Sequence, residues 1–107
     1  MVTLIKDNLA RIQDVCKKHH VKSFYLIGSA ARETDFGSES DVDFLYRFTY
    51  ENQTETNDID YAENYFSLLE DLQNVLKRRV DLVSGERNTN PYFINSINQD
   101  KQLLYEA

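Results

Sequence analysis

Apolar positions near the N-terminus predict a helix followed at once by a buried strand. From Val2 to His19 they recur every three or four positions, the period that places side chains on one face of a helix. This stripe contains Ile5, Leu9, Ile12, Cys16 and His19. The next run, Val21–Ile27, is short, rich in aliphatic and aromatic residues, and stops at Gly28. Such a run bounded by glycine is typical of a strand.

Alternation of apolar and polar positions predicts a second strand over Asp41–Phe48. A loop precedes it, because residues 33–41 are turn-formers and small polar groups. Side chains of a strand point alternately to its two faces. One face would carry Val42, Phe44, Tyr46 and Phe48, and the other Asp41, Asp43, Leu45 and Arg47. We therefore expect the first of these faces to lie against the core.

A second long helix and a third strand follow a polar connection over residues 49–58. Tyrosines and leucines at helical spacing begin at Tyr61 and continue to the cations Lys77–Arg79. Cations suit the negative end of a helix dipole, so the helix is expected to end on them. Val80–Val83 is a short apolar strand interrupted by Asp81 and closed by Ser84 and Gly85.

The C-terminal region predicts a short helix and leaves the last element open. Asn90 and Pro91 are typical of an N-cap and a first helical position, which makes Tyr92–Asn98 a short helix. Lys101–Glu106 fits either a final strand or a continuation of that helix. Strands separated by helices indicate an α/β fold, with helices packed on a small sheet. We find no repeat and no linker, and expect one domain over residues 1–107.

Composition and charge narrow the range of partners. The chain has 107 residues, with 12 basic and 18 acidic side chains and a net charge of −6. Direct binding of nucleic acid is not expected, since affinity for its backbone comes largely from cations that neutralise phosphates. No stretch has the length of a membrane span or the pattern of a signal peptide, so we expect a cytoplasmic protein. One cysteine and two histidines leave no disulfide and no zinc-finger set.

Candidate chemistry begins where the first strand ends, at Gly28 and Ser29. A glycine there lets the chain approach a ligand closely. Ser29 and nearby backbone N–H groups, at the start of a turn that follows Gly28, would be placed to hold phosphate oxygens. Asp41 and Asp43 lie two positions apart on the second strand, so they face one side with Cα atoms ~6.5–7 Å apart. Because the two carboxylates repel each other, a divalent cation such as Mg²⁺ would convert that repulsion into binding.

Asp81 is the third acidic residue of the pattern. Its flanks are apolar, and burying a carboxylate among them is costly unless the group is paired or bound to metal. If its strand neighbours the Asp41–Phe48 strand, the three carboxylates converge. Three acids, two metals and a phosphate cradle are the parts of two-metal phosphoryl or nucleotidyl transfer. An isolated Asp-x-Asp pair is also typical of a solvated strand face, so the prediction depends on the combination.

Three segments of the chain resemble the minimal nucleotidyltransferases (MNT) of the DNA polymerase beta superfamily, a group that includes MNT antitoxins. They are Leu26–Arg32, Ser40–Leu45 and Val80–Val83. The stretch from Asn90 to Glu106 is also similar, so the resemblance spans nearly the whole chain. The sequence departs from the family pattern at Glu33, where many members have glycine, and in a slightly longer spacer before Asp41.

The resemblance implies a polymerase beta-like core with a small mixed sheet, and a role for each matching residue. Gly28, Ser29, Arg32 and Ser40 would bind the nucleotide. Asp41 and Asp43 would hold Mg²⁺, and Asp81 would hold the catalytic metal and activate the acceptor hydroxyl. The implied enzyme is a protein adenylyltransferase that uses a two-metal site and ATP as substrate.

The resemblance also implies a partner. MNT antitoxins pair with HEPN-domain proteins, often RNase toxins, so we expect a hetero-oligomer in which AMP is transferred to a tyrosine of the toxin. Two alternatives stay open. One is a non-catalytic module that neutralises the HEPN partner by masking it, although a pure mask needs no clustered acids. The other is a heteromeric nucleotidyltransferase for a small molecule, against which the lack of a recognisable substrate domain counts.

Overall fold

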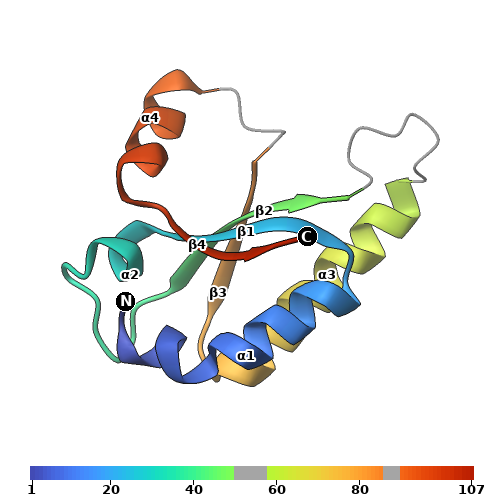
Figure 1. The fold of residues 1–107 in the computed structure, drawn as a ribbon, viewed down its shortest axis with the longest axis horizontal. Coiled ribbons are helices and arrows are strands. Elements are labelled where there is room, and N and C mark those ends of the chain that lie inside the picture. Colours follow the sequence, from blue (N-terminus) through green and yellow to red (C-terminus); the bar gives the residue numbers. More distant parts are fainter. Residues whose placement is uncertain (50–57, 86–89) are drawn as a thin grey trace.

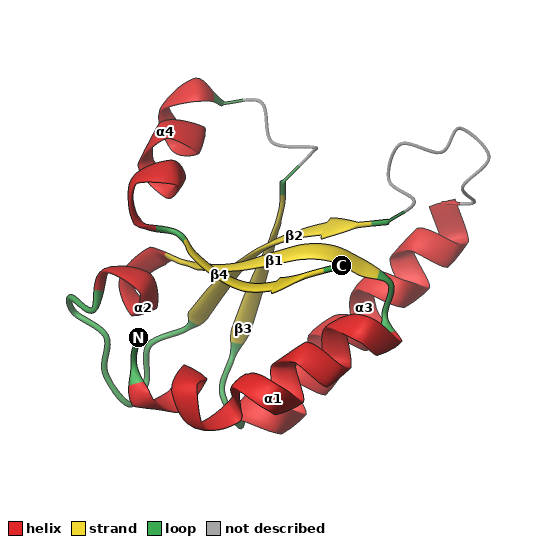
Figure 2. Cartoon of the chain, in the orientation of Figure 1, coloured by secondary structure: helices red, strands yellow, loops and turns green. Residues whose placement is uncertain are grey.

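Four strands form one sheet, with helices on both of its faces (Figures 1 and 2). The computed structural model describes residues 1–49, 58–85 and 90–107. In chain order the elements are α1 (Thr3–Lys18), β1 (Val21–Ile27), α2 (Gly28–Arg32), β2 (Val42–Phe48), α3 (Asp58–Leu76), β3 (Val80–Ser84), α4 (Pro91–Asp100) and β4 (Gln102–Glu106). The polar connection predicted over residues 49–58 falls mostly outside the described residues.

The sheet is mixed, with the strand order β3-β2-β1-β4. β1 pairs antiparallel with β2 on one side and with β4 on the other, whereas β2 and β3 are parallel. Parallel neighbours need a crossover connection, and α3 lies between β2 and β3 in the chain. The predicted α/β class and the small mixed sheet are therefore confirmed.

α1 and α3 cover one face of the sheet and form the core with it (Figure 1). The alternation predicted for β2 is confirmed, because Val42, Phe44, Tyr46 and Phe48 are all buried. Phe44 stacks on Phe24 of β1 with ring centroids 4.7 Å apart. Cys16 also belongs to this core, and burial raises the pKa of its thiol to about 12. That cysteine is an apolar packing residue and not a reactive thiol.

α4 lies on the opposite face of the sheet from α1 and α3 (Figure 1). Its predicted start is confirmed, because the Asn90 side chain accepts hydrogen bonds from the backbone N–H groups of Tyr92 and Phe93. The helix ends where Lys101 donates its backbone N–H to the carbonyl of Ile97. The segment that follows is a strand, which settles the choice left open by periodicity. This strand pairs with β1 on the side away from β2 and makes hydrogen bonds with the backbone N–H and C=O groups there.

Two local features differ from the prediction. The residues after Gly28 form the short helix α2, where the pattern indicated only a turn. α3 ends at Leu76, and Lys77 adopts a left-handed conformation with φ of 55°. The helix therefore ends directly before the three predicted cations, which lie at its C-terminus and outside its last turn. No helix in the described ranges is both long enough and apolar enough to cross a membrane.

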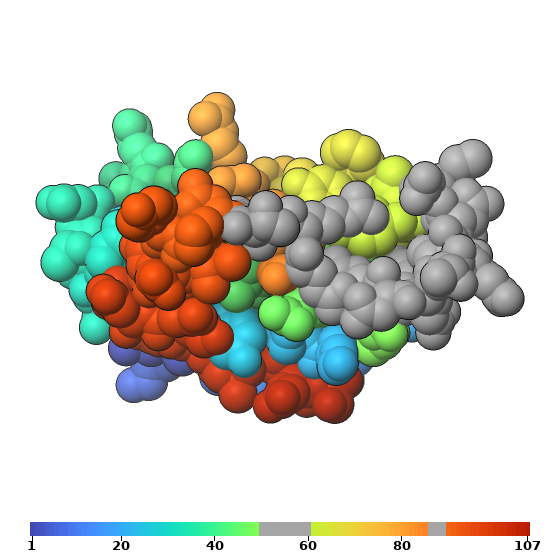
Figure 3. All heavy atoms as spheres, turned by 90° about the horizontal axis from the view of Figure 1, so that it is seen from above, coloured from blue at the N-terminus to red at the C-terminus, as the bar shows by residue number. Residues whose placement is uncertain are grey.

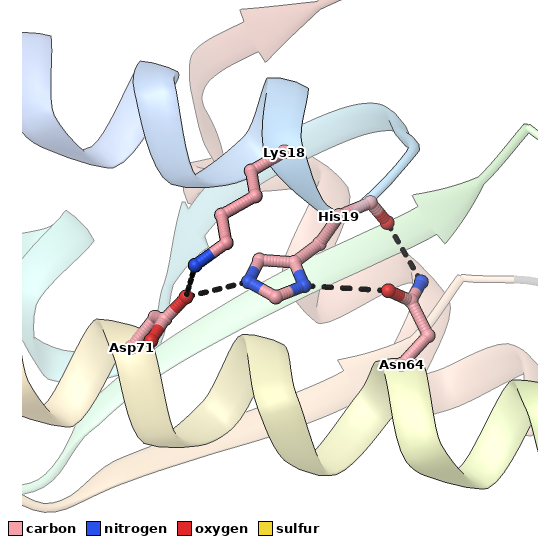
Figure 4. Close-up of polar contacts among 4 residues, drawn as sticks. All are labelled: Lys18, His19, Asn64 and Asp71. Carbon is pink, nitrogen blue, oxygen red and sulfur yellow. Dashed lines mark hydrogen bonds and ion pairs between the residues drawn. The ribbon is translucent and has the colours of Figure 1, made fainter.

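A polar cluster joins the end of α1 to α3 (Figure 4). The buried His19 ring places Nε2 2.6 Å from Asp71 Oδ2 and Nδ1 3.3 Å from Asn64 Oδ1. The Asn64 amide nitrogen donates to the backbone oxygen of His19, which orients its own oxygen toward the ring. Both ring nitrogens thus lie within hydrogen-bonding distance of side-chain oxygens on α3. Lys18 adds a 3.2 Å ion pair to Asp71.

We expect Asp71→Asn to lower the free energy of unfolding at pH 7 by about 1–2 kcal/mol. This is below the ~1.5–3 kcal/mol usual for a hydrogen bond to a charged group, because the Asp71 side chain is 30% exposed and solvent screens it. The hydrogen bond from His19 holds the pKa of Asp71 below its usual range. A depressed folded-state pKa stabilises the fold above the unfolded value, ~3.9, and that contribution is lost as the pH falls through the folded value. Urea denaturation from pH 7 to pH 2 should show a shallower acid dependence for the variant. Asp14→Asn, an exposed change on α1, is the matched control and should follow the wild type.

Candidate active site

Asp43 of β2 and Asp81 of β3 lie directly opposite each other in the parallel pairing of these strands. The neighbours of Asp81 in the strand, Val80 and Leu82, are buried on the side of the sheet that α1 and α3 cover. Alternation places both carboxylates on the other side of the sheet, the side of α4. The predicted neighbourhood of the two strands is therefore confirmed. Asp81 itself is exposed, because β3 is an edge strand, so burial among its apolar flanks does not occur.

Gly28 lies against Asp43 at the end of β1. It follows Ile27, the residue that pairs with Asp43 across the sheet, and its φ is +71°. A Cβ built on Gly28 would overlap Oδ2 of the Asp43 carboxylate. Both the left-handed backbone and the close carboxylate therefore require glycine at this position.

The carboxylates of Asp41, Asp43 and Asp81, which we call the acidic edge, repel one another. Partial burial raises the pKa of Asp43, and the charges of Asp81 and then Asp41 raise it further, while Arg32 opposes them. A cation placed among these carboxylates would relieve that repulsion, so their charge fits a divalent metal ion. Within the described ranges, no three histidine, cysteine, aspartate or glutamate side chains are spaced as a ready ligand set. The three aspartates thus form a cluster of negative charge rather than a preformed set of metal ligands.

A cavity of about 150 Å³ opens between this edge and α4. One side is lined by residues of the sheet and of α2, namely Ile27, Gly28, Arg32, Asp43, Asp81 and Val83, and the other by residues of α4, namely Phe93, Ser96, Ile97 and Asp100. None of the α4 residues was among the predicted site residues. Phe93, Ile97 and Asp100 are spaced to share one face of a helix that starts at Asn90, and this spacing was the available signal.

Comparison with known proteins assigns the family. The family model for polymerase beta, nucleotidyltransferase, matches residues 10–107. The chain belongs to this nucleotidyltransferase family. It is 36% identical over 102 residues to "Putative protein adenylyltransferase MJ1379" of Methanocaldococcus jannaschii, covering 94% of this chain and 93% of that protein.

Two solved structures resemble this nucleotidyltransferase in fold. One is a crystal structure of a toxin-antitoxin with AMP-PNP, with a TM-score of 0.65 at 20% identity, over 94% of this chain and 74% of the other. The second contains a tri-AMPylated HEPN toxin of Shewanella oneidensis in complex with MNT antitoxin. Its TM-score is 0.60 at 18% identity, over 95% of this chain and 72% of the other.

The loop that precedes Asp41 in the nucleotidyltransferase is held by Arg78. Its guanidinium donates to the backbone oxygens of Gly37, at 2.6 Å, and Ser40, and it lies 4.9 Å from the centre of the Phe36 ring. The Ser40 hydroxyl accepts from the N–H of Gly37 and donates to the backbone oxygen at position 35. Arg78, one of the three cations after α3, thus braces the loop that leads to Asp41.

The structure brings together only some of the predicted site residues. Gly28, Arg32, Asp43 and Asp81 line the cavity, whereas among the described residues Ser29, Ser40 and Asp41 lie outside its lining. Asp41 immediately precedes β2 and is exposed.

Glu33, the departure from the family pattern, ends α2 in a left-handed conformation with φ of 59°. A left-handed residue costs roughly 1–2 kcal/mol for a side chain with a Cβ and little for glycine. Its carboxylate lies 3.4 Å from the N-terminal amine of Met1, on the surface of the molecule. The sequence difference at Glu33 is therefore accommodated in the same backbone that glycine would adopt.

We expect Gly28→Ala to damage the site more than the fold. The new methyl group would push the Asp43 carboxylate away and strain a left-handed backbone. Nucleotide binding should weaken at least tenfold by calorimetry, while the free energy of unfolding falls by only about 1–2 kcal/mol, the cost of the backbone conformation. Gly37→Ala is the matched control, since nothing lies within 4 Å of a Cβ built there. If Gly28→Ala binds the nucleotide as tightly as the wild type, nucleotide binding does not depend on the position of the Asp43 carboxylate next to residue 28.

Proposed function

We propose that this nucleotidyltransferase transfers AMP from ATP to a tyrosine hydroxyl of a HEPN-domain protein, with Mg²⁺ at the acidic edge, and thereby acts as an antitoxin. The observation that carries the proposal is the alignment of Asp43 with Asp81 beside Gly28. Support for a protein acceptor comes from the relative that is named as a protein adenylyltransferase. Support for a HEPN partner comes from the complex of an MNT antitoxin with an AMPylated toxin.

In this proposal the nucleotide lies on the α2 side of the site. Gly28 leaves room for a ligand near the backbone, and Arg32 lines the cavity with a cation that suits phosphate oxygens. Ser29 and Ser40 lie outside the cavity lining and would reach the nucleotide from its border. Asp41 and Asp43 would hold Mg²⁺ with Asp81, and the metal ions would supply charge neutralisation at the phosphates.

Asp81 would act on the acceptor. A tyrosine hydroxyl has a pKa near ~10 and is a weak nucleophile at neutral pH. The exposed Asp81 carboxylate would accept the hydroxyl proton as the phenolic oxygen bonds to the α-phosphorus of ATP. The bond between the α-phosphorus and the bridging oxygen breaks, and pyrophosphate leaves. The products are the O-adenylyl tyrosine and pyrophosphate.

The test is direct transfer. ATP labelled at the α-phosphate is incubated with Mg²⁺, the nucleotidyltransferase and its HEPN partner, followed by mass spectrometry of the partner's tyrosines and an assay of its toxic activity. AMP on a tyrosine together with loss of toxic activity is the expected result. Full neutralisation without AMP transfer would favour a masking module, and transfer only to small hydroxyl compounds would favour a small-molecule enzyme.

A further inference from the structure

A second, larger cavity lies on the α4 side of the sheet, beside the candidate active site. Its volume is about 470 Å³, and its floor is formed by Tyr25 of β1 and Leu45 of β2. α4 forms one wall, with Phe93, Ile94 and Ile97. Figure 3 views this face, with α4 in orange-red next to the light-blue residues of β1 and the green residues of β2. We call this cavity the sheet groove.

The sheet groove leads into the active site. Phe93 and Ile97 line both cavities, so the two share the inner face of α4. β2 also runs through both, with Asp43 in the active site and Leu45 and Arg47 in the groove. These three side chains lie on one side of the strand at successive steps of about 7 Å. A chain lying along the groove would thus be able to place one side chain at Asp43 and Asp81.

The groove is basic in an acidic protein. Of the described residues that line it, Lys22, Arg47 and Lys101 are cationic and only Glu106 has a side-chain carboxylate, whereas the whole chain has a net charge of −6. Two of the cations are held in place. The Lys101 ammonium lies 4.6 Å from the centre of the Tyr25 ring, and the Arg47 guanidinium donates to the backbone oxygen of Gly85 at 3.3 Å. Fixed cations over aromatic and aliphatic walls suit a ligand that is both apolar and anionic.

We infer that the sheet groove binds the polypeptide segment that carries the acceptor hydroxyl, and that this segment has acidic side chains next to the acceptor. The inference rests on the proposed function for the choice of a polypeptide. The apolar floor accommodates an aromatic ring, and the three cations attract the neighbouring carboxylates. A nucleic acid fits less well, because its phosphates would continue from the groove toward Asp43, Asp81 and Asp100 and be repelled there.

The first measurement is binding of short fluorescent peptides by anisotropy, in the presence of Mg²⁺ and a non-hydrolysable ATP analogue. One peptide has a central tyrosine flanked by glutamates and the other the same tyrosine flanked by lysines. We expect the acidic peptide to bind at least about tenfold more tightly, the scale of two exposed ion pairs, and the preference to shrink with added salt. Equal binding of the two peptides, or tighter binding of a single-stranded oligonucleotide of equal charge, would overturn the inference.

The second measurement assigns the preference to the groove. Lys22→Glu/Lys101→Glu should abolish the preference for the acidic peptide while leaving the affinity for Mg²⁺–ATP unchanged. Lys6→Glu/Arg11→Glu makes the same change of charge at exposed positions of α1, on the other face of the sheet, and should bind both peptides like the wild type. Loss of the preference in both double variants would mean that net charge is responsible and would overturn the groove. If the wild type prefers the acidic peptide but transfers AMP to no protein, the proposed function is refuted. The inference that the groove binds an acidic polypeptide segment is then still supported.

Discussion

Asp81→Asn is expected to lower AMP transfer at least ~10²-fold, the usual size of a general-base contribution, while most of the affinity for ATP is retained. Asp81 is exposed, so the asparagine needs no new packing and the fold should be unaffected. The defect should therefore be in the rate of transfer and not in nucleotide binding. Single-turnover transfer from α-labelled ATP to the HEPN partner, alongside calorimetric titration with Mg²⁺–ATP, separates the two.

The control for this variant is Asp14→Asn, which removes the same charge from the other face of the molecule. It should transfer AMP at the wild-type rate. An additional readout comes from Asp43, whose pKa is raised in part by the charge of Asp81. Carboxyl titration by NMR should show the pKa of Asp43 falling toward its ordinary value in Asp81→Asn. Undiminished AMP transfer in this variant would remove Asp81 from the mechanism.

Asp41→Asn/Asp43→Asn is expected to weaken binding of Mg²⁺–ATP at least ~10²-fold. Loss of a residue that only supports a metal ligand already costs up to ~10²-fold, and the proposal makes these two carboxylates the ligands themselves. The physical reason is that the carboxylate cluster attracts the cation and the cation attracts the phosphates. With chelator present, the sign should reverse. Metal-free ATP should bind the double variant no more weakly than the wild type, because two negative charges that repel its phosphates are gone. Calorimetric titration with and without Mg²⁺ measures both affinities.

The same double variant should be more stable than the wild type without metal. The pKa of Asp43 is raised in the folded state, so its contribution to stability is present below the unfolded value and is lost as the pH rises through the folded one. At pH 7 the ionised carboxylate therefore destabilises the fold, and asparagine removes that penalty. The melting temperature in chelator should rise. Tight Mg²⁺–ATP binding by the double variant would place the site elsewhere.

Local pattern was sufficient to predict most of the elements. Three predicted features are found in the structure: the alternation in β2, the apolar stripe of α1 and the cap at Asn90. Each depends only on residues that are close together in the sequence. The family motifs likewise marked Gly28 and the aspartates, because such chemistry depends on residue type and short spacing. α2 escaped prediction since five residues are too few to show a helical period.

The sequence by itself thus determined the α/β class, the helix and strand periods and the candidate residues of the site. Tertiary structure alone decided what those residues meet. Pairing with β1 makes residues 102–106 a strand, and the parallel register of β2 and β3 sets Asp43 against Asp81. The edge position of β3 leaves Asp81 exposed, and the docking of α4 adds Phe93 and Asp100 to the cavity. These outcomes depend on contacts between segments far apart in the chain, which a local pattern of residues does not encode.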